Sequence, residues 1–148
     1  MKGQNNIINE ILLFMIGMSI TAAVIINFQN VQKSANDTIV YSNFNNIANT
    51  IINGITEAEK AEKGKVVVKV PDKIASEVYI IKASGDSLVI YSINNPEINV
   101  TKNLFKFNIS GSHIIYGEVP STAQYIEIVS EKTAFTRLVN VRRAERYA

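Results

Sequence analysis

The stretch from Ile7 to Phe28 places the strongest constraint on this chain. It reads IINEILLFMIGMSITAAVIINF and carries no charged residue between Ile11 and Ile26. The uncharged core of about 16 residues is slightly shorter than the roughly 20 apolar residues that cross a bilayer as a helix, while the whole stretch of about 22 residues is long enough. We therefore predict one membrane helix over residues 7–28, at the cost of including Glu10 near its start.

Two other interpretations of this stretch stay open. A buried core helix is one, although a helix that is apolar on all sides needs a large protein around it. A cleaved secretory signal is the other, since Lys2 is a basic start and Thr21-Ala22-Ala23 supplies small residues for cleavage. The apolar run continues beyond these alanines to Phe28, where a signal peptidase requires a polar, extended chain. The membrane helix is therefore the preferred interpretation.

Apolar residues continue at helical spacing beyond the membrane segment and form one stripe on an otherwise polar helix. The stripe comprises Val31, Ala35, Ile39, Phe44, Ile47, Ile51, Ile55 and Ala58. No proline or glycine lies between Gly17 and Gly54. The two segments therefore predict a single rod of about 50 residues, roughly 75 Å long at 1.5 Å per residue. We expect its amphipathic part over about residues 29–60 and its end in a solvated charged run, 57–63, before Gly64.

After Gly64 the pattern changes to short β-rich runs separated by turn residues. The runs begin at residues 65, 77, 87, 97, 104, 113, 124 and 134. About eight strands at a spacing of roughly 8 to 12 residues indicate an antiparallel sandwich or a strongly curved sheet. The predicted fold class is α+β, with a long N-terminal hydrophobic and amphipathic helix followed by an antiparallel β-sandwich-like domain over residues 64–148. The helix stripe would pack on the open face of the sheet.

Charge argues against nucleic-acid binding. The 148 residues leave room for one membrane helix and one small domain, and their formal net charge is only +2. The one basic cluster stands near the C-terminal end, where charged residues are usually solvated, with an anionic partner as the less favoured alternative. This cluster consists of Arg137, Arg142, Arg143 and Arg146.

Residues suited to catalysis are scarce. The chain has one histidine, His113, and no cysteine, and it shows no paired carboxylates and no Gly-rich phosphate loop. His113 begins a predicted strand beside Gly111-Ser112, where a histidine is usually a surface or turn residue. We therefore expect no enzyme activity, no cofactor and no metal site.

Residues at the two ends of the membrane segment indicate its orientation. Lys2 and the N-terminal amine precede the segment, and the next cation is Lys33, so the N-terminus is expected on the cytoplasmic side. Glu10 is then expected at the lipid headgroups, against a cation or against a partner helix. Three Asn-x-Ser/Thr triplets, at Asn36, Asn99 and Asn108, are candidate N-glycosylation sites in the part placed outside the membrane.

At the N-terminus, the tripeptide Lys2-Gly3-Gln4 is followed by a short polar stretch and then by an apolar helix that runs on into an amphipathic one. This arrangement resembles the class III signal of archaeal type IV pilin-like proteins. The resemblance covers about the first 30 residues in pattern and the remainder in architecture only. It implies that a prepilin peptidase cuts between Gly3 and Gln4, which leaves residues 1–3 as a leader and a mature helix over residues 4–63.

The resemblance also implies assembly through packed N-terminal helices, with the β-rich domain displayed outside the cell. Small residues allow close helix approach in membranes. Here they are Gly17, Ser19, Thr21, Ala22 and Ala23. In bacterial pilins a glutamate near the start of the mature helix pairs with a neighbouring subunit's amine, and Glu10 stands later in the mature chain than that glutamate.

The leading hypothesis is a structural subunit of an archaeal type IV pilus-like surface filament. Its partners would be further copies of itself in a helical homopolymer or other pilin-like subunits, together with the prepilin peptidase and the membrane. The alternative is a single-pass anchored binding or stator-like protein of the archaellum accessory type. In that case the helix stays in the membrane and the external β domain binds a partner.

Overall fold

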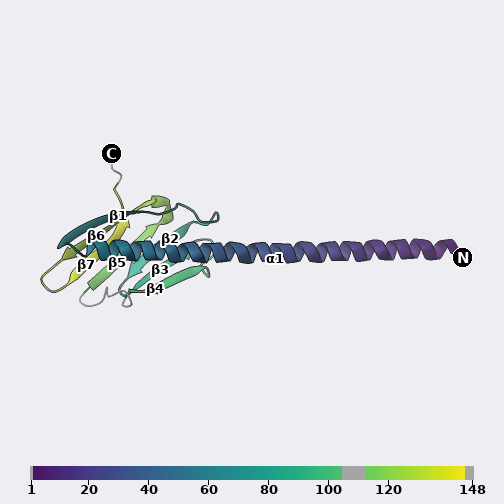
Figure 1. Cartoon of the computed structure of the whole chain (residues 1–148), viewed down its shortest axis with the longest axis horizontal. Coiled ribbons are helices and arrows are strands. Elements are labelled where there is room, and N and C mark those ends of the chain that lie inside the picture. Colours follow the sequence, from purple (N-terminus) through teal and green to yellow (C-terminus); the bar gives the residue numbers. More distant parts are fainter. Residues whose placement is uncertain (1, 105–112, 146–148) are drawn as a thin grey trace. The chain divides into compact units, whose positions relative to one another are not determined.

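The computed structural model describes residues 2–104 and 113–145, without the side chains of residues 2–6. The chain divides into two compact units, Met1–Thr38 and Ile39–Ala148. The elements are α1 (Lys2–Ala58), β1 (Lys63–Lys69), β2 (Tyr79–Ser84), β3 (Ser87–Ser92), β4 (Asn99–Asn103), β5 (His113–Pro120), the 3-10 helix η2 (Ser121–Ala123), β6 (Tyr125–Lys132) and β7 (Arg137–Arg143) (Figure 1). The α+β class predicted from the sequence is confirmed.

Helix α1 makes up the described part of the first unit and the beginning of the second. It begins at Lys2, before the predicted start, and ends at Ala58, before the predicted end at residue 63. Gly64 lies against this end of the helix, because a Cβ atom there would be 1.8 Å from the Ala58 carbonyl oxygen. The chain therefore turns back closely over the end of the helix, and Lys63 already belongs to β1.

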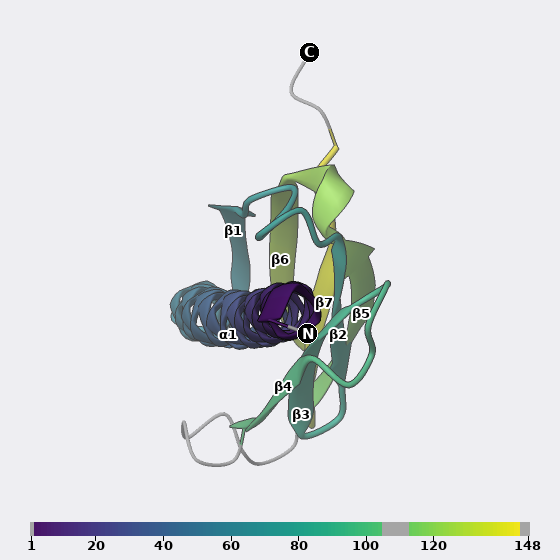
Figure 2. The ribbon, with the colours of Figure 1, turned by 90° about the vertical axis from the view of Figure 1, so that its right-hand side faces the viewer.

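The described strands form one seven-stranded sheet in the order β1-β6-β7-β5-β2-β3-β4. Every neighbouring pair is antiparallel except β5 and β7, which are parallel. Seven of the eight predicted runs contain a strand, and most of the run from residue 104 lies outside the described residues. The sheet is curved, and its second layer is the helix (Figure 2).

Within the second unit, α1 covers one face of the sheet. A Cβ atom on Gly54 would lie 2.7 Å from Cδ1 of Ile128 and 3.0 Å from Cγ2 of Val68, so the helix packs tightly on β6 and β1. Phe44 and Tyr79 are fully buried, with ring centroids 5.2 Å apart, and join the helix to β2. This packing confirms that the helix lies against the open face of the sheet.

The buried stripe of α1 differs in part from the predicted one. Phe44, Ile47, Ile51, Ile55 and Ala58 are buried as predicted. The N-terminal members are not, since Val31 is 66% and Ile39 is 50% exposed, and Val40 is buried instead. The physical reason is the five-residue step from Ile39 to Phe44, which turns about 140° around a helix at 100° per residue and so leaves Ile39 off the inner face.

Candidate functional site

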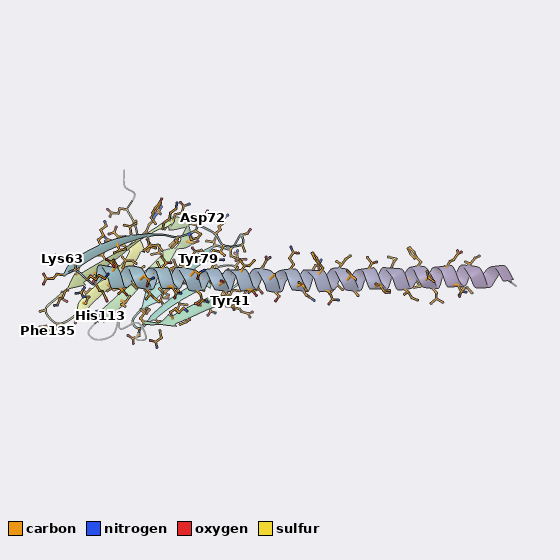
Figure 3. All side chains as sticks on the ribbon, viewed as in Figure 1. Tyr41, Lys63, Asp72, Tyr79, His113 and Phe135 are labelled. Carbon is orange, nitrogen blue, oxygen red and sulfur yellow. The ribbon has the colours of Figure 1, made fainter. Side chains whose placement is uncertain are left out.

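The N-terminal apolar segment of α1 exposes large hydrophobic side chains all around the helix. Their exposed fractions run from 52% at Leu12 and Ile25 to 75% at Leu13. Figure 3 shows side chains standing out on both sides of the ribbon along this part of the helix. Contact with water is unfavourable for apolar surface by about 25 cal/mol per Å², so a continuous surface of this kind indicates a lipid or protein environment.

Polar side chains inside this segment form hydrogen bonds within their own helix. Ser19 Oγ donates to the Met15 carbonyl at 2.8 Å, and Thr21 Oγ1 donates to the Gly17 carbonyl at 2.9 Å. Asn27 Nδ2 donates to the Ala23 carbonyl at 2.8 Å. An unpaired polar group costs several kcal/mol in hydrocarbon, roughly 2 to 7 kcal/mol for an amide or hydroxyl. These hydrogen bonds therefore lower the cost of placing residues 15–28 in an apolar environment.

The helix is long and apolar enough to cross a membrane, and its apolar window is unburied within the molecule. Glu10 is exposed at the start of the apolar segment. The charged residue that follows it is Lys33, because residues 11–32 are all uncharged. The segment is thus bounded by one charge at each side, as expected for a helix whose ends meet water or headgroups.

The small residues of the segment fall on two opposite faces of α1. A rotation of about 100° per residue places Gly17 and Thr21 on one face and Ser19, Ala22 and Ala23 on the other. A Cβ atom on Gly17 would meet nothing within 4 Å, so this position is open. The structure therefore leaves both faces free for close approach by another helix.

The remaining predicted modification sites lie in different settings. Gly3 and Gln4 belong to the first turn of α1, where the structure describes the backbone only. Asn36 is exposed on α1, and Asn99 is exposed on the edge strand β4, where its amide donates to the Pro96 carbonyl at 3.0 Å. Asn108 lies outside the described residues.

A polar cluster at the C-terminal end of α1 corrects three expectations. His113 is inward-facing with a side chain only 22% exposed, and its Nε2 lies 3.3 Å from Oε1 of Glu59. Glu59 was expected in a solvated run, yet its side chain is 16% exposed. Arg137 was expected in a solvated basic tail, yet it donates to the carbonyls of Glu59 and Ala61. The residues meet because β5 and β7 pair His113 with Arg137 in parallel register, which no local sequence signal reveals.

Burial raises the pKa of the Glu59 carboxyl above its ordinary range, although the nearby charges of His113 and Arg137 oppose this shift. The opposite face of the sheet holds a second ionic group, in which Glu127 accepts from Arg142 Nη2 at 2.8 Å and lies 3.1 Å from Lys65 Nζ. The hydrogen bond from Arg142 lowers the pKa of Glu127. Both groups join neighbouring elements of the fold and have structural roles.

Among the described residues, no group of three or more His, Cys, Asp or Glu side chains is arranged to hold a metal ion. No known protein family matches the chain, and neither a curated protein nor a solved structure is significantly similar to it. The exposed apolar segment of α1 is therefore the feature on which a functional assignment rests.

Proposed function

We propose that this protein is a structural subunit of an archaeal type IV pilus-like surface filament and that it polymerises through its N-terminal hydrophobic helix. The observation that carries the proposal is the exposure of the large apolar side chains between Ile7 and Phe28. The class III-like tripeptide Lys2-Gly3-Gln4, which stands shortly before this apolar segment, supports it. In this proposal the N-terminus faces the cytoplasm, and the β-rich domain lies outside the cell.

The physical basis of assembly is an exchange of equivalent environments. A helix that is apolar all around is stable in lipid, and it is equally stable when identical helices replace the lipid as the subunit leaves the membrane. The hydrogen bonds of Ser19, Thr21 and Asn27 stay within the helix in both environments. The two faces of small residues allow each helix to contact more than one neighbour. Removal of residues 1–3 by a prepilin peptidase would precede this step.

The N-terminal mass of the native protein tests the proposal. It should be measured in isolated cell membranes and, separately, in the material sheared from the cell surface. A chain that begins at Gln4 in the sheared fraction is the expected result. An intact Met1 found only in the membrane fraction would contradict the filament and leave an anchored protein.

A substitution in the helix tests the proposed assembly surface directly. Ile16→Arg places a charge in the centre of the apolar segment, where it costs about 2.5 to 3.5 kcal/mol on insertion scales, and should abolish the surface form. Ile16→Leu is the matched control, because it keeps both the apolar character and the size of the side chain. Equal amounts of surface material from both variants would contradict assembly through this segment.

A second candidate function is a membrane-anchored binding or stator-like protein, and one observation favours it. The face of the sheet turned away from α1 exposes Ile114 by 51%, Tyr116 by 45% and Tyr125 by 47%. Half-exposed apolar residues of this kind fit a protein partner. Tyr116→Lys should then abolish function while the protein stays in the membrane, whereas a filament subunit would still appear in the sheared fraction.

A further inference from the structure

The face of α1 that points away from the sheet carries no charge over five turns. Between Asp37 and Glu57 the sequence contains no charged residue and no histidine. The inner side of this stretch is the buried stripe that packs on the sheet, and the outer side consists mainly of amide and hydroxyl side chains, with the half-exposed Ile39 near its start. The exposed polar residues from Ser42 to Asn53 that share one face at about 100° per residue are Ser42, Asn46, Asn49, Thr50 and Asn53. We name these five residues the amide stripe.

The asparagines of the amide stripe have unused hydrogen-bonding capacity. Asn43 and Asn45 lie beside the stripe, and their amides donate to carbonyls one turn earlier at 2.8 Å and 3.0 Å. Within the described part of the chain, the side chains of Asn46, Asn49 and Asn53 form no hydrogen bond. Each of these three amides offers two donors and two acceptor lone pairs to whatever lies against the helix.

A helix face that remains in water normally carries charged residues, often as opposite charges one turn apart. The other exposed face of this unit follows that rule, because the outer side of the sheet carries Lys65, Lys82, Glu118 and Arg142. The amide stripe departs from it. The contrast within one small domain indicates that the stripe faces a protein surface in the functional state.

We propose that the amide stripe is a contact surface for a second copy of this chain, so that the subunit contact extends along α1 beyond its apolar segment. The inference rests on the proposed filament function and deepens it, because it assigns a second set of contacts to the same helix. In this arrangement the asparagines of one subunit form hydrogen bonds with the amide stripe of its neighbour.

The chemistry of the amide stripe selects an identical partner. Identical chains that pack along the same helix bring like residues near like residues, and charges of one sign would then repel each other. An amide both donates and accepts, so asparagines of two identical helices that lie side by side with little stagger satisfy one another. The stripe is also part of the same continuous helix, α1, as the exposed apolar segment, without an intervening proline or glycine between Gly17 and Gly54.

Cross-linking in the native assembly tests the contact. The chain has no cysteine, so a single Asn49→Cys substitution gives a unique attachment point for a short bismaleimide cross-linker. Asn94→Cys is the control, because Asn94 is an exposed asparagine in the loop between β3 and β4. The expected result is a cross-linked dimer of this chain in the surface fraction with Asn49→Cys and little or none with Asn94→Cys.

A third variant, Ile16→Cys, separates this inference from the filament proposal. Dimers with Ile16→Cys but none with Asn49→Cys would overturn the contact through the amide stripe and leave the filament standing. No dimers with either variant would overturn both proposals. Two further outcomes would overturn the contact between copies. One is a cross-link from Asn49→Cys to a different protein, and the other is equal dimer formation with Asn94→Cys.

Charge substitution gives an independent readout. The double variant Asn49→Lys with Asn53→Lys should fold normally, because both positions are exposed and lysine is a better helix former than asparagine. It should reduce the amount of sheared surface material at least about tenfold, since like charges then face each other across the contact. Asn94→Lys should leave the amount unchanged. Undiminished assembly of the double variant, at normal membrane levels, would overturn the inference.

Discussion

Arg137 Nη1 donates a hydrogen bond to the main-chain carbonyl of Glu59, with 2.6 Å between the two atoms. The same nitrogen lies 3.0 Å from the carbonyl oxygen of Ala61 and 3.2 Å from Ser130 Oγ. The last carbonyls of a helix have no partner within the helix and carry its partial negative charge. A guanidinium from β7 therefore satisfies the carbonyls just beyond the C-terminal end of α1 and attaches the helix end to the sheet.

Replacing Arg137 should destabilise the fold. Arg137→Leu removes the donor from partly buried carbonyls, and hydrogen bonds to charged groups contribute about 1.5 to 3 kcal/mol each, so we expect a loss of about 2 to 3 kcal/mol. Arg143→Leu on the same strand is the matched control for an exposed arginine and should cost below about 0.5 kcal/mol. Urea unfolding of the full chain in detergent micelles, followed by tyrosine fluorescence, measures both. Equal losses would show that the contact to the helix end adds nothing.

The Glu59 carboxyl should make the fold more stable at acidic pH than at neutral pH. Burial raises the pKa of its carboxyl in the folded state above the ordinary value of 4.5, despite the opposing charges of His113 and Arg137. A raised pKa in the folded state contributes stability that is fully present below the unfolded pKa and is lost as the pH rises through the folded pKa. Glu59→Gln should therefore flatten the dependence of the melting temperature on pH above about 4.5.

The control for this experiment is Glu62→Gln, which changes an exposed glutamate in the same connection between α1 and β1. Its melting temperature should follow the pH in the same way as that of the unmodified chain. If Glu59→Gln and Glu62→Gln show the same pH profile, the buried carboxyl of Glu59 does not titrate as its burial predicts.

Glu127 should have the opposite dependence on pH. The hydrogen bond from Arg142 lowers the pKa of its carboxyl in the folded state, with Lys65 adding to the effect and burial opposing it. A lowered pKa contributes stability that is present above the unfolded pKa and is lost as the pH falls through the folded pKa. Glu127→Gln should therefore lower the melting temperature at neutral pH and should have a smaller effect in acid. A loss of the same size at both pH values would contradict this account.

Gly117 should tolerate no side chain. Its φ of 143° is rarely adopted by residues with a Cβ, and a Cβ atom there would lie 1.9 Å from the Val141 carbonyl oxygen. Gly117→Ala must push β5 away from β7 and should cost about 3 kcal/mol or more. Gly85→Ala is the control: φ is 58°, nothing lies within 4 Å, and about 1 kcal/mol is expected. Similar unfolding midpoints for the two variants would show that the strands separate easily at this point.

The long helix and most of the strands are predictable from local sequence patterns alone. The uncharged run after Glu10 and the absence of proline and glycine between Gly17 and Gly54 predict a long helix with an apolar first part. Local backbone geometry is sufficient for this, since a helix forms its hydrogen bonds between residues four apart. Most strands were also predicted, because alternation along a half-buried strand is likewise a local pattern.

Contacts between residues that are distant along the chain depend on the three-dimensional fold. The parallel pairing of β5 with β7 brings His113 beside Arg137, and the return of the chain over Ala58 brings Glu59 to both of them. The sequence placed all three in solvent, because burial of a charged side chain depends on strands that are distant along the chain. In the same way, the uncharged outer face of α1 became visible only when the sheet defined the inner face. Hydrophobic periodicity in the sequence predicts which residues share a face of a helix or strand. Strand order and register determine which other residues lie against that face.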